Sequence, residues 1–126
     1  MRILLIEDNP DHIFLARQAI KDTWNNATLH VARDLHEARV LLRRTHRRTH
    51  FDLLLATLDP RDVDGLARLR ELRACPPLKG AHVIALVNST RDQELAQVAN
   101  QSVDWIMLKP LRAEALRKAM QQRPLP

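Results

Sequence analysis

Charged side chains stand directly after two short apolar runs of this chain. Glu7 and Asp8 follow residues 2–6, and Lys109 follows a run that ends at Leu108. An ammonium group near two carboxylates is suited to ion pairing, and a carboxylate that precedes a helix is favoured by the positive end of the helix dipole. The simplest chemistry for these residues is therefore that Lys109 is a counter-ion to Glu7 and Asp8, if the fold brings them together.

Five short runs rich in Leu, Ile and Val alternate with stretches of helical periodicity. The runs predict strands at Arg2–Ile6, Thr28–Ala32, residues 52–57, His82–Val87 and Trp105–Leu108. Between them, apolar residues recur at three- and four-residue steps, which predicts helices. Alternating strands and helices indicate a mostly parallel sheet, covered on both faces and joined by right-handed crossovers. Functional residues are then expected beyond the carboxyl ends of the strands.

Capping residues and prolines set the expected helix boundaries. Asn9 before Pro10 predicts the N-cap and the first residue of the first helix. Thr90 and Gln93 have the spacing of a capping box, ahead of a helix that runs to about Gln101. Two further helices are expected, one at residues 66–73, opened by Asp64 and Gly65 and stopped by Pro76 and Pro77, and one at residues 111–121.

Composition is that of a globular protein and excludes several other classes. The chain has 126 residues and is expected to form one domain, residues 1–126, with 45% hydrophobic and 28% charged residues. No apolar run approaches the ~18 residues of a membrane span, and the apolar N-terminal run is too short for a secretory signal. A single cysteine, Cys75, excludes an internal disulfide and a cysteine-based zinc site. We expect a cytoplasmic protein that does not bind a membrane.

The chain has more basic than acidic residues, and one interpretation of this excess is an acidic binding partner. The formal net charge is +5, and the only dense cluster of cations is the tandem repeat at residues 43–50, with four arginines. Because this cluster ends a predicted helix, a solvated helix end and loop explain it. Nucleic-acid binding is the weaker alternative, since no aromatic residues interleave the arginines and no reader motif is present. The six histidines show no metal-ligand pairing with the cysteine.

Four phrases of the sequence together resemble the receiver domain of bacterial response regulators. They are residues 3–10, 51–55, 64–65 and 107–110, and they occur in receiver order and spacing over nearly the full chain. The resemblance implies an α/β fold of the flavodoxin-like, doubly wound (βα)5 type, with a five-stranded parallel sheet. It also implies a cytoplasmic role in two-component or phosphorelay signal transduction.

The resemblance assigns roles to individual positions. In the family, an acidic pair and an acceptor aspartate hold Mg²⁺, the acceptor attacks a phosphohistidine on a sensor kinase, and a lysine neutralises the transferred group. Glu7 and Asp8 match the acidic pair, and Lys109 matches the lysine. The acceptor position is Thr57. Asp59 stands at the loop position whose backbone carbonyl helps to bind the metal in the family.

Three departures from the family pattern indicate an atypical member. Thr57 is neutral and cannot form an aspartyl phosphate, so the position is not expected to be phosphorylated. Val87 replaces the hydroxyl residue that senses the phosphate, and Ile106 replaces the aromatic switch residue. We therefore expect no enzyme activity and no cofactor, with at most weak or vestigial Mg²⁺ binding at Glu7, Asp8 and Asp59.

The leading hypothesis is a stand-alone receiver that acts by protein contact without aspartate phosphorylation. The partners implied are signalling proteins, a sensor kinase or another regulator. Members of the family also meet partners or dimerise through the face made by the fourth helix, the strand Trp105–Leu108 and residues 111–121. An alternative is that Asp59 acts as a substitute acceptor, which a shift of two residues disfavours because near-attack geometry does not tolerate such a displacement.

Overall fold

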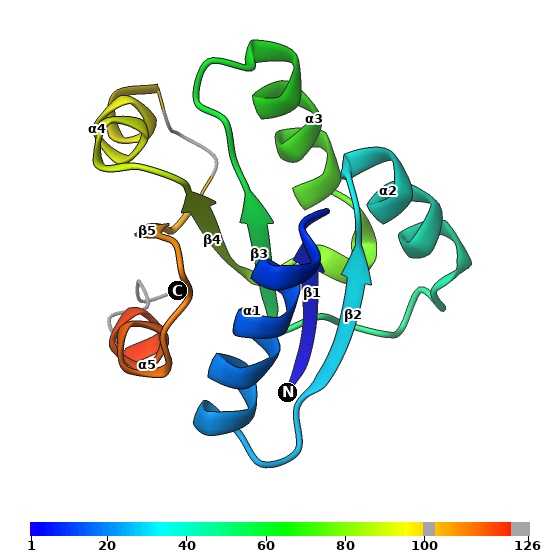
Figure 1. Ribbon diagram of the computed structural model, residues 1–126. Helices are drawn as coiled ribbons and strands as arrows, with labels where there is room; N and C mark the ends of the chain where they lie inside the picture. Colours follow the sequence, from blue (N-terminus) through cyan, green and yellow to red (C-terminus); the bar gives the residue numbers. More distant parts are fainter. Residues whose placement is uncertain (100–102, 122–126) are drawn as a thin grey trace.

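The core of the molecule is one sheet of five parallel strands in the order β2-β1-β3-β4-β5 (Figure 1). The computed structural model describes residues 1–99 and 103–121. The strands are β1 (Arg2–Ile6), β2 (Thr28–Ala32), β3 (Leu53–Thr57), β4 (His82–Val87) and β5 (Trp105–Leu108). The helices are α1 (Pro10–Thr23), α2 (Leu35–Arg44), α3 (Val63–Arg73), α4 (Thr90–Ala99) and α5 (Ala113–Gln121), with a 3-10 turn η1 (Pro76–Leu78). This strand order confirms the expected flavodoxin-like fold.

Helices cover both faces of the sheet (Figure 1). The central strands β1, β3 and β4 are therefore apolar except for one terminal residue each. On one face, α1 and α5 bury Ile20 and Leu116 against side chains of β1, β3 and β4. On the other face, α2, α3 and α4 bury residues such as Leu42 and Leu69 against the same strands. Trp105 and Ile106, neighbours in β5, belong to opposite layers, as strand alternation predicts.

The start of α3 differs from the sequence-based expectation. The helix begins at Val63 rather than residue 66, because the carboxylate of Asp62 caps it by accepting the N–H of Gly65 at 2.9 Å. A Cβ atom at Gly65 would lie 2.5 Å from the Asp62 carboxylate, so glycine leaves the space that this cap needs. Asp62 and Asp64 are both plausible cap residues by type, and only the folded loop decides between them.

Smaller differences occur at other boundaries. The third strand begins at Leu53 rather than residue 52, although the N–H of Asp52 still donates to the carbonyl of Arg2 at 2.8 Å and its carbonyl accepts the N–H of His82 at 3.0 Å. The hydroxyl of Ser89, not of Thr90, caps α4 by accepting the N–H of Asp92 at 3.1 Å. The last helix begins at Ala113, and the expected helix end at Gln101 lies outside the described residues.

No helix within residues 1–99 and 103–121 combines the length and the apolar character that a membrane crossing needs.

Candidate functional site

Glu7 is held at the carboxyl edge of the sheet by the two strands that flank β1. The chain leaves β1 at Ile6, which pairs with Ala32 of β2 and Ala56 of β3. The N–H of Glu7 then donates to the carbonyl of Ala32 at 2.9 Å, so the pairing with β2 extends to this residue. Its side chain is only 3% exposed. A carboxylate buried to this degree needs partners for both oxygens.

Both oxygens of Glu7 have such partners. Oε2 accepts the backbone N–H groups of Asp8 at 2.9 Å and Asn9 at 3.1 Å, where the chain turns into α1. Oε1 accepts the Thr57 hydroxyl at 2.9 Å and the Lys109 ammonium at 2.5 Å. Residues from the ends of β1, β3 and β5 thus converge on one carboxylate, although they are up to 102 positions apart in the sequence.

The electrostatics of Glu7 are those of a stably ionised group. Burial alone would raise the pKa of its carboxyl, but the hydrogen bonds from Lys109, the Asn9 N–H and Thr57, with the charge of Lys109, lower it from 4.5 to about 2. The side chain of Lys109 is itself only 9% exposed. Lys109 and Glu7 therefore form a buried ion pair with additional neutral donors, which is a neutral unit as a whole.

His12 is part of the same cluster, although the sequence alone did not assign it to the site. Its Nδ1 lies 3.3 Å from Glu7 Oε1 and 3.3 Å from the Lys109 nitrogen. Asn9 caps α1 with its side chain, so His12 falls in the first turn of the helix, above the end of β1. The usable signal was this helical position three residues after the cap, rather than a metal-ligand spacing.

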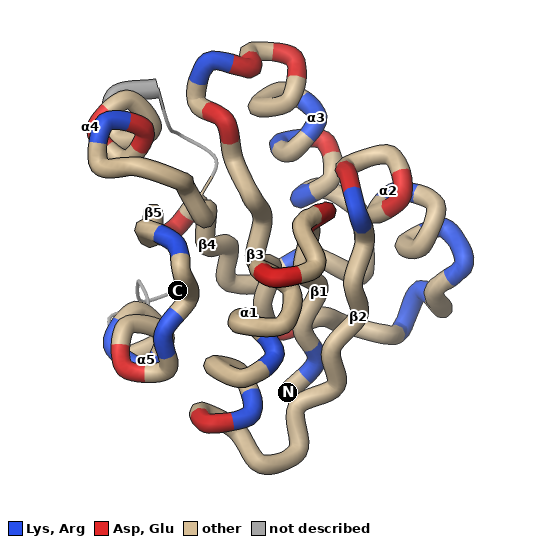
Figure 2. Tube along the Cα trace, in the orientation of Figure 1, with Lys and Arg blue, Asp and Glu red and all other residues tan. Residues whose placement is uncertain are grey.

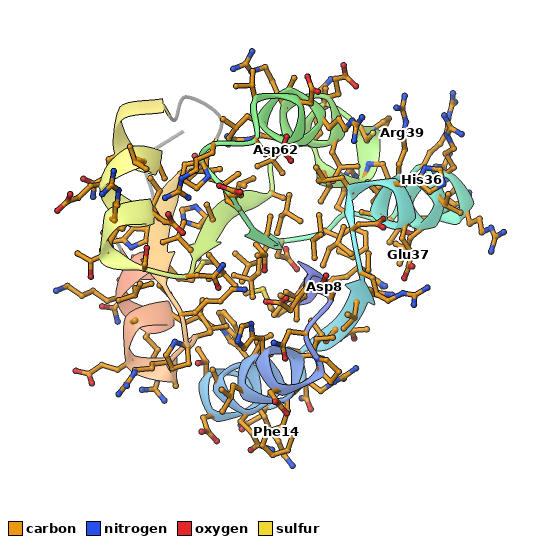
Figure 3. All side chains as sticks on the ribbon, turned by 45° about the horizontal axis from the view of Figure 1, so that its top comes forward. Asp8, Phe14, His36, Glu37, Arg39 and Asp62 are labelled. Carbon is orange, nitrogen blue, oxygen red and sulfur yellow. The ribbon has the colours of Figure 1, made fainter. Side chains whose placement is uncertain are left out.

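Asp8 points away from the cluster that Glu7 forms. Its side chain is exposed, and Figure 3 labels it at the carboxyl edge of the sheet. The ion pairs of the described residues join Lys109 to Glu7 and do not include Asp8. The fold thus brings together Glu7, Thr57 and Lys109, and it separates the two members of the expected acidic pair.

The donor set does not fit Mg²⁺, which takes several oxygen ligands and retains part of its water. Glu7 uses both oxygens in hydrogen bonds, with an ammonium group on one of them, and Thr57 contributes no charge. Asp8 has an exposed side chain, and no ion pair within residues 1–99 and 103–121 includes it. Across residues 1–99 and 103–121, no group of three or more His, Cys, Asp or Glu side chains is arranged to hold a metal ion.

Asp59 belongs to a separate set of charges. Its carboxylate accepts the backbone N–H of Arg61 at 3.0 Å and lies 3.4 Å from the Arg61 guanidinium. Arg61 also pairs with Asp92 in the first turn of α4 at 2.8 Å. The Asp59 side chain is 62% exposed. Arg61 therefore links the loop after β3 to α4 and holds the Asp59 carboxylate within the loop.

Val87 and Ile106, the two switch positions, lie inside the sheet layer under α4. Val87 ends β4 and is fully buried, in the same cluster as Ala96 of α4. Ile106 packs against this cluster from β5. Neither side chain has a polar atom, so neither can make a hydrogen bond that depends on a group bound at the strand ends.

Comparisons with known proteins agree with this architecture. The sequence matches the response regulator receiver domain family over residues 3–121. The probable methanogenesis regulatory protein FilR2 of Methanothrix harundinacea (strain 6Ac) is 28% identical over 123 residues, which cover 95% of this chain and 79% of that protein.

Solved structures include similar folds. The bacteriophytochrome response regulator AtBRR is 30% identical with a TM-score of 0.76, over 95% of this chain and 89% of AtBRR. A second similar structure is the receiver domain of the sensor histidine kinase PA1611 from Pseudomonas aeruginosa PAO1, which has a magnesium ion coordinated in its active site cleft. It is 22% identical with a TM-score of 0.70, over 97% of this chain and 95% of that domain. This chain belongs to the response regulator receiver domain family, whose members are signalling modules that interact with kinases and other regulators in two-component systems.

Proposed function

We propose that this protein is an atypical receiver that acts through protein contact and takes no phosphoryl group at position 57. The main observation in support of this proposal is that one oxygen of Glu7 accepts hydrogen bonds from both the Thr57 hydroxyl and the Lys109 ammonium. In a receiver that accepts phosphate, the lysine is needed by the phosphoryl group and the residue at position 57 is a carboxylate nucleophile. Here the lysine is committed to a buried ion pair, and the nucleophile is a neutral alcohol.

The environment of Thr57 also disfavours its activation as an alcohol nucleophile. The base within reach of its proton is Glu7, at 2.9 Å. A general base works best when its pKa is near the working pH, and the pKa of Glu7 is lowered to about 2. The hydroxyl therefore acts as a hydrogen-bond donor that helps to keep Glu7 ionised.

Weak metal binding belongs to the same proposal. The PA1611 receiver domain coordinates a magnesium ion in its active site cleft. In this chain, a cation at the equivalent edge would compete with the ammonium of Lys109 for Glu7 and would gain one exposed carboxylate, that of Asp8. We expect a dissociation constant no tighter than about 1 mM, roughly −4 kcal/mol.

The surface formed by α4, β5 and α5 is the proposed contact face for a sensor kinase, another regulator or a second copy of the chain. Leu95 of α4 and Leu108 of β5 are 38% and 39% exposed, which leaves apolar area on this face. Such a role requires no catalysis by the chain and is compatible with the cytoplasmic location expected from the sequence.

Incubation with acetyl phosphate and Mg²⁺, followed by intact-mass measurement, tests the proposal. We expect no phosphorylated species for the wild type, and beryllofluoride with Mg²⁺ should not change its amide NMR spectrum. The Thr57→Asp variant is the control, because it restores the acceptor carboxylate. A stoichiometric, hydroxylamine-labile phosphate on the wild type would refute the proposal. Its loss in Asp59→Asn would establish Asp59 as the substitute acceptor.

A further inference from the structure

Residues of α2 and α3 line a groove. These two helices lie on the face of the sheet opposite to α1 and α5 (Figure 1). The groove encloses about 660 Å³. None of the residues at the strand ends lines it. The sequence indicated the two helices but gave no indication of a space between them.

The floor of this groove is apolar. Leu72 is buried, Leu35 and Cys75 are partly buried, and Ala67 lies on the exposed side of α3. The small side chain of Ala67 leaves space between the two helices at the surface, while Leu69 and Leu42 are buried in the core beneath them. An open apolar floor of this kind favours an occupant with apolar side chains of its own.

The α2 wall of the groove is cationic. His36 and Arg39 line it (Figure 3). Arg43 follows Arg39 by four residues, which places it on the same face of the helix. Arg47 and Arg48 extend the charge beyond the helix end, as Figure 2 shows in blue. Within residues 1–99 and 103–121, none of these four arginines forms an ion pair. Their charges are available to a partner.

The α3 wall has charges of both signs. Asp64 and Glu71 lie there with Arg68, so the three charged residues of this wall carry a net charge of −1. On the other side of α2, Arg33 is paired with Glu37 at 3.2 Å and does not add to the groove. Within the groove, Arg39 and Arg68 balance Asp64 and Glu71, so the excess of positive charge beside it comes from the arginines at the end of α2 and in the turn after it.

We propose that this groove docks an amphipathic helix of a partner protein, with its apolar side chains on the floor and its acidic side chains along α2. Helices that bind in grooves use apolar anchors three and four residues apart, and α2, about 15 Å long, matches roughly three turns of such a helix. Opposite charge on the rim provides orientation and a faster encounter. The inference adds a contact surface to the proposed action by protein contact.

A nucleic acid fits the same groove less well. The chain has four aromatic residues, Phe14, Trp24, Phe51 and Trp105, and none of them lines the groove to stack on a base. The apolar floor also has no counterpart on a sugar-phosphate backbone. The observations thus favour a protein segment over a nucleic acid.

The test uses a designed amphipathic helix of about four turns, with leucines on one face and glutamates beside them. Its affinity for the full chain is measured by fluorescence anisotropy at low and physiological salt. The location is read from Cys75, the only cysteine of the chain, whose alkylation by iodoacetamide should slow when the groove is filled. A peptide with serines in place of the leucines and the same charge is the matched ligand control.

Two pairs of variants separate charge from shape. Arg39→Gln with Arg43→Gln should weaken binding about three- to tenfold, whereas Lys21→Gln with Lys118→Gln, an equal change of charge elsewhere, should have little effect. Ala67→Gln, which extends into the groove, should weaken binding at least about threefold, and Ala67→Ser should not.

No binding of the designed helix, equal binding of the serine peptide, or no protection of Cys75 would overturn the proposal. Tighter binding of a DNA duplex at physiological salt, dependent on the same arginines, would overturn it in favour of a nucleic acid. These readouts differ from the phosphorylation test, so either proposal can fail while the other stands.

Discussion

Acid titration of Glu7 is the most direct test of the ion-pair account of the site. In the folded protein the pKa of this carboxyl is about 2, against 4.5 for a free glutamate. A lowered pKa stabilises the fold above the unfolded-state value, and this stabilisation is lost as the pH falls from about 4.5 toward 2. The difference between 4.5 and about 2, at 1.36 kcal/mol per pH unit, corresponds to about 3 kcal/mol.

The perturbation is Glu7→Gln, and the measurement is the free energy of unfolding by urea at intervals between pH 7 and pH 2.5. At pH 7 the variant should be less stable by several kcal/mol, because the buried ammonium of Lys109 loses its counter-ion. Below about pH 4.5 the wild type should lose about 3 kcal/mol more than the variant does. The two stability curves should therefore approach each other near pH 2.

Asp8→Asn is the matched control, since it removes a neighbouring negative charge but leaves every contact of Glu7 in place. This variant should keep the extra acid sensitivity that Glu7 gives to the wild type. If Glu7→Gln and the wild type instead lose the same free energy of unfolding from pH 5 to pH 2.5, Glu7 is not the group whose protonation destabilises the wild type in acid. The ion-pair account of the site would then be wrong.

Three further predictions follow from the same geometry. Lys109→Met should destabilise the fold at pH 7 by about 3–5 kcal/mol in urea unfolding, because it leaves the Glu7 carboxylate buried without its cation; an unchanged midpoint would contradict this. The Thr57→Asp variant should bind Mg²⁺ measurably in calorimetric titration, while the wild type should have a dissociation constant of about 1 mM or weaker. Equal affinities would show that the missing carboxylate at position 57 is not the cause of the weak Mg²⁺ binding. Val87→Thr should lower stability by about 1–3 kcal/mol in thermal unfolding, because it buries a hydroxyl in an apolar cluster; Val63→Thr, at a position 74% exposed, is the matched control and should have little effect.

Most of the fold could be predicted from the sequence because its strands are continuous apolar runs between turn residues. Four of the five strands have the expected bounds, and β3 differs by one residue. Helix starts were less predictable, since α3 and α4 each offer two nearby candidates for the cap. Ser89 and Thr90 carry the same functional group, and only the direction of the chain after β4 selects Ser89.

The site was predictable in its position but not in its orientations. Parallel strands place Glu7, Thr57 and Lys109 at one edge, so their proximity follows from the fold. Which of Glu7 and Asp8 faces inward does not follow, because β1 is buried on both faces and gives no alternation to extend. The pair between Arg61 and Asp92 joins the loop after β3 to the first turn of α4, and no local pattern in the sequence indicates it.

The three departures from the receiver pattern have a common electrostatic consequence. An aspartate at position 57 would place a second carboxylate beside Glu7, and the excess negative charge would attract a divalent cation or hold Lys109 between two acids. With Thr57, the charge of Glu7 is balanced by Lys109 alone, and the hydroxyl supplies one more hydrogen bond. A cluster that is already neutral gains little from binding a metal or a phosphoryl group.

Under the proposed function, polar residues at positions 87 and 106 would have no bound group to report, and the apolar Val87 and Ile106 stabilise the layer beneath α4 instead. The surfaces of the helices then remain as the means by which such a receiver can act, which is why the α2–α3 groove and the α4–β5–α5 face are the places to look for its partners.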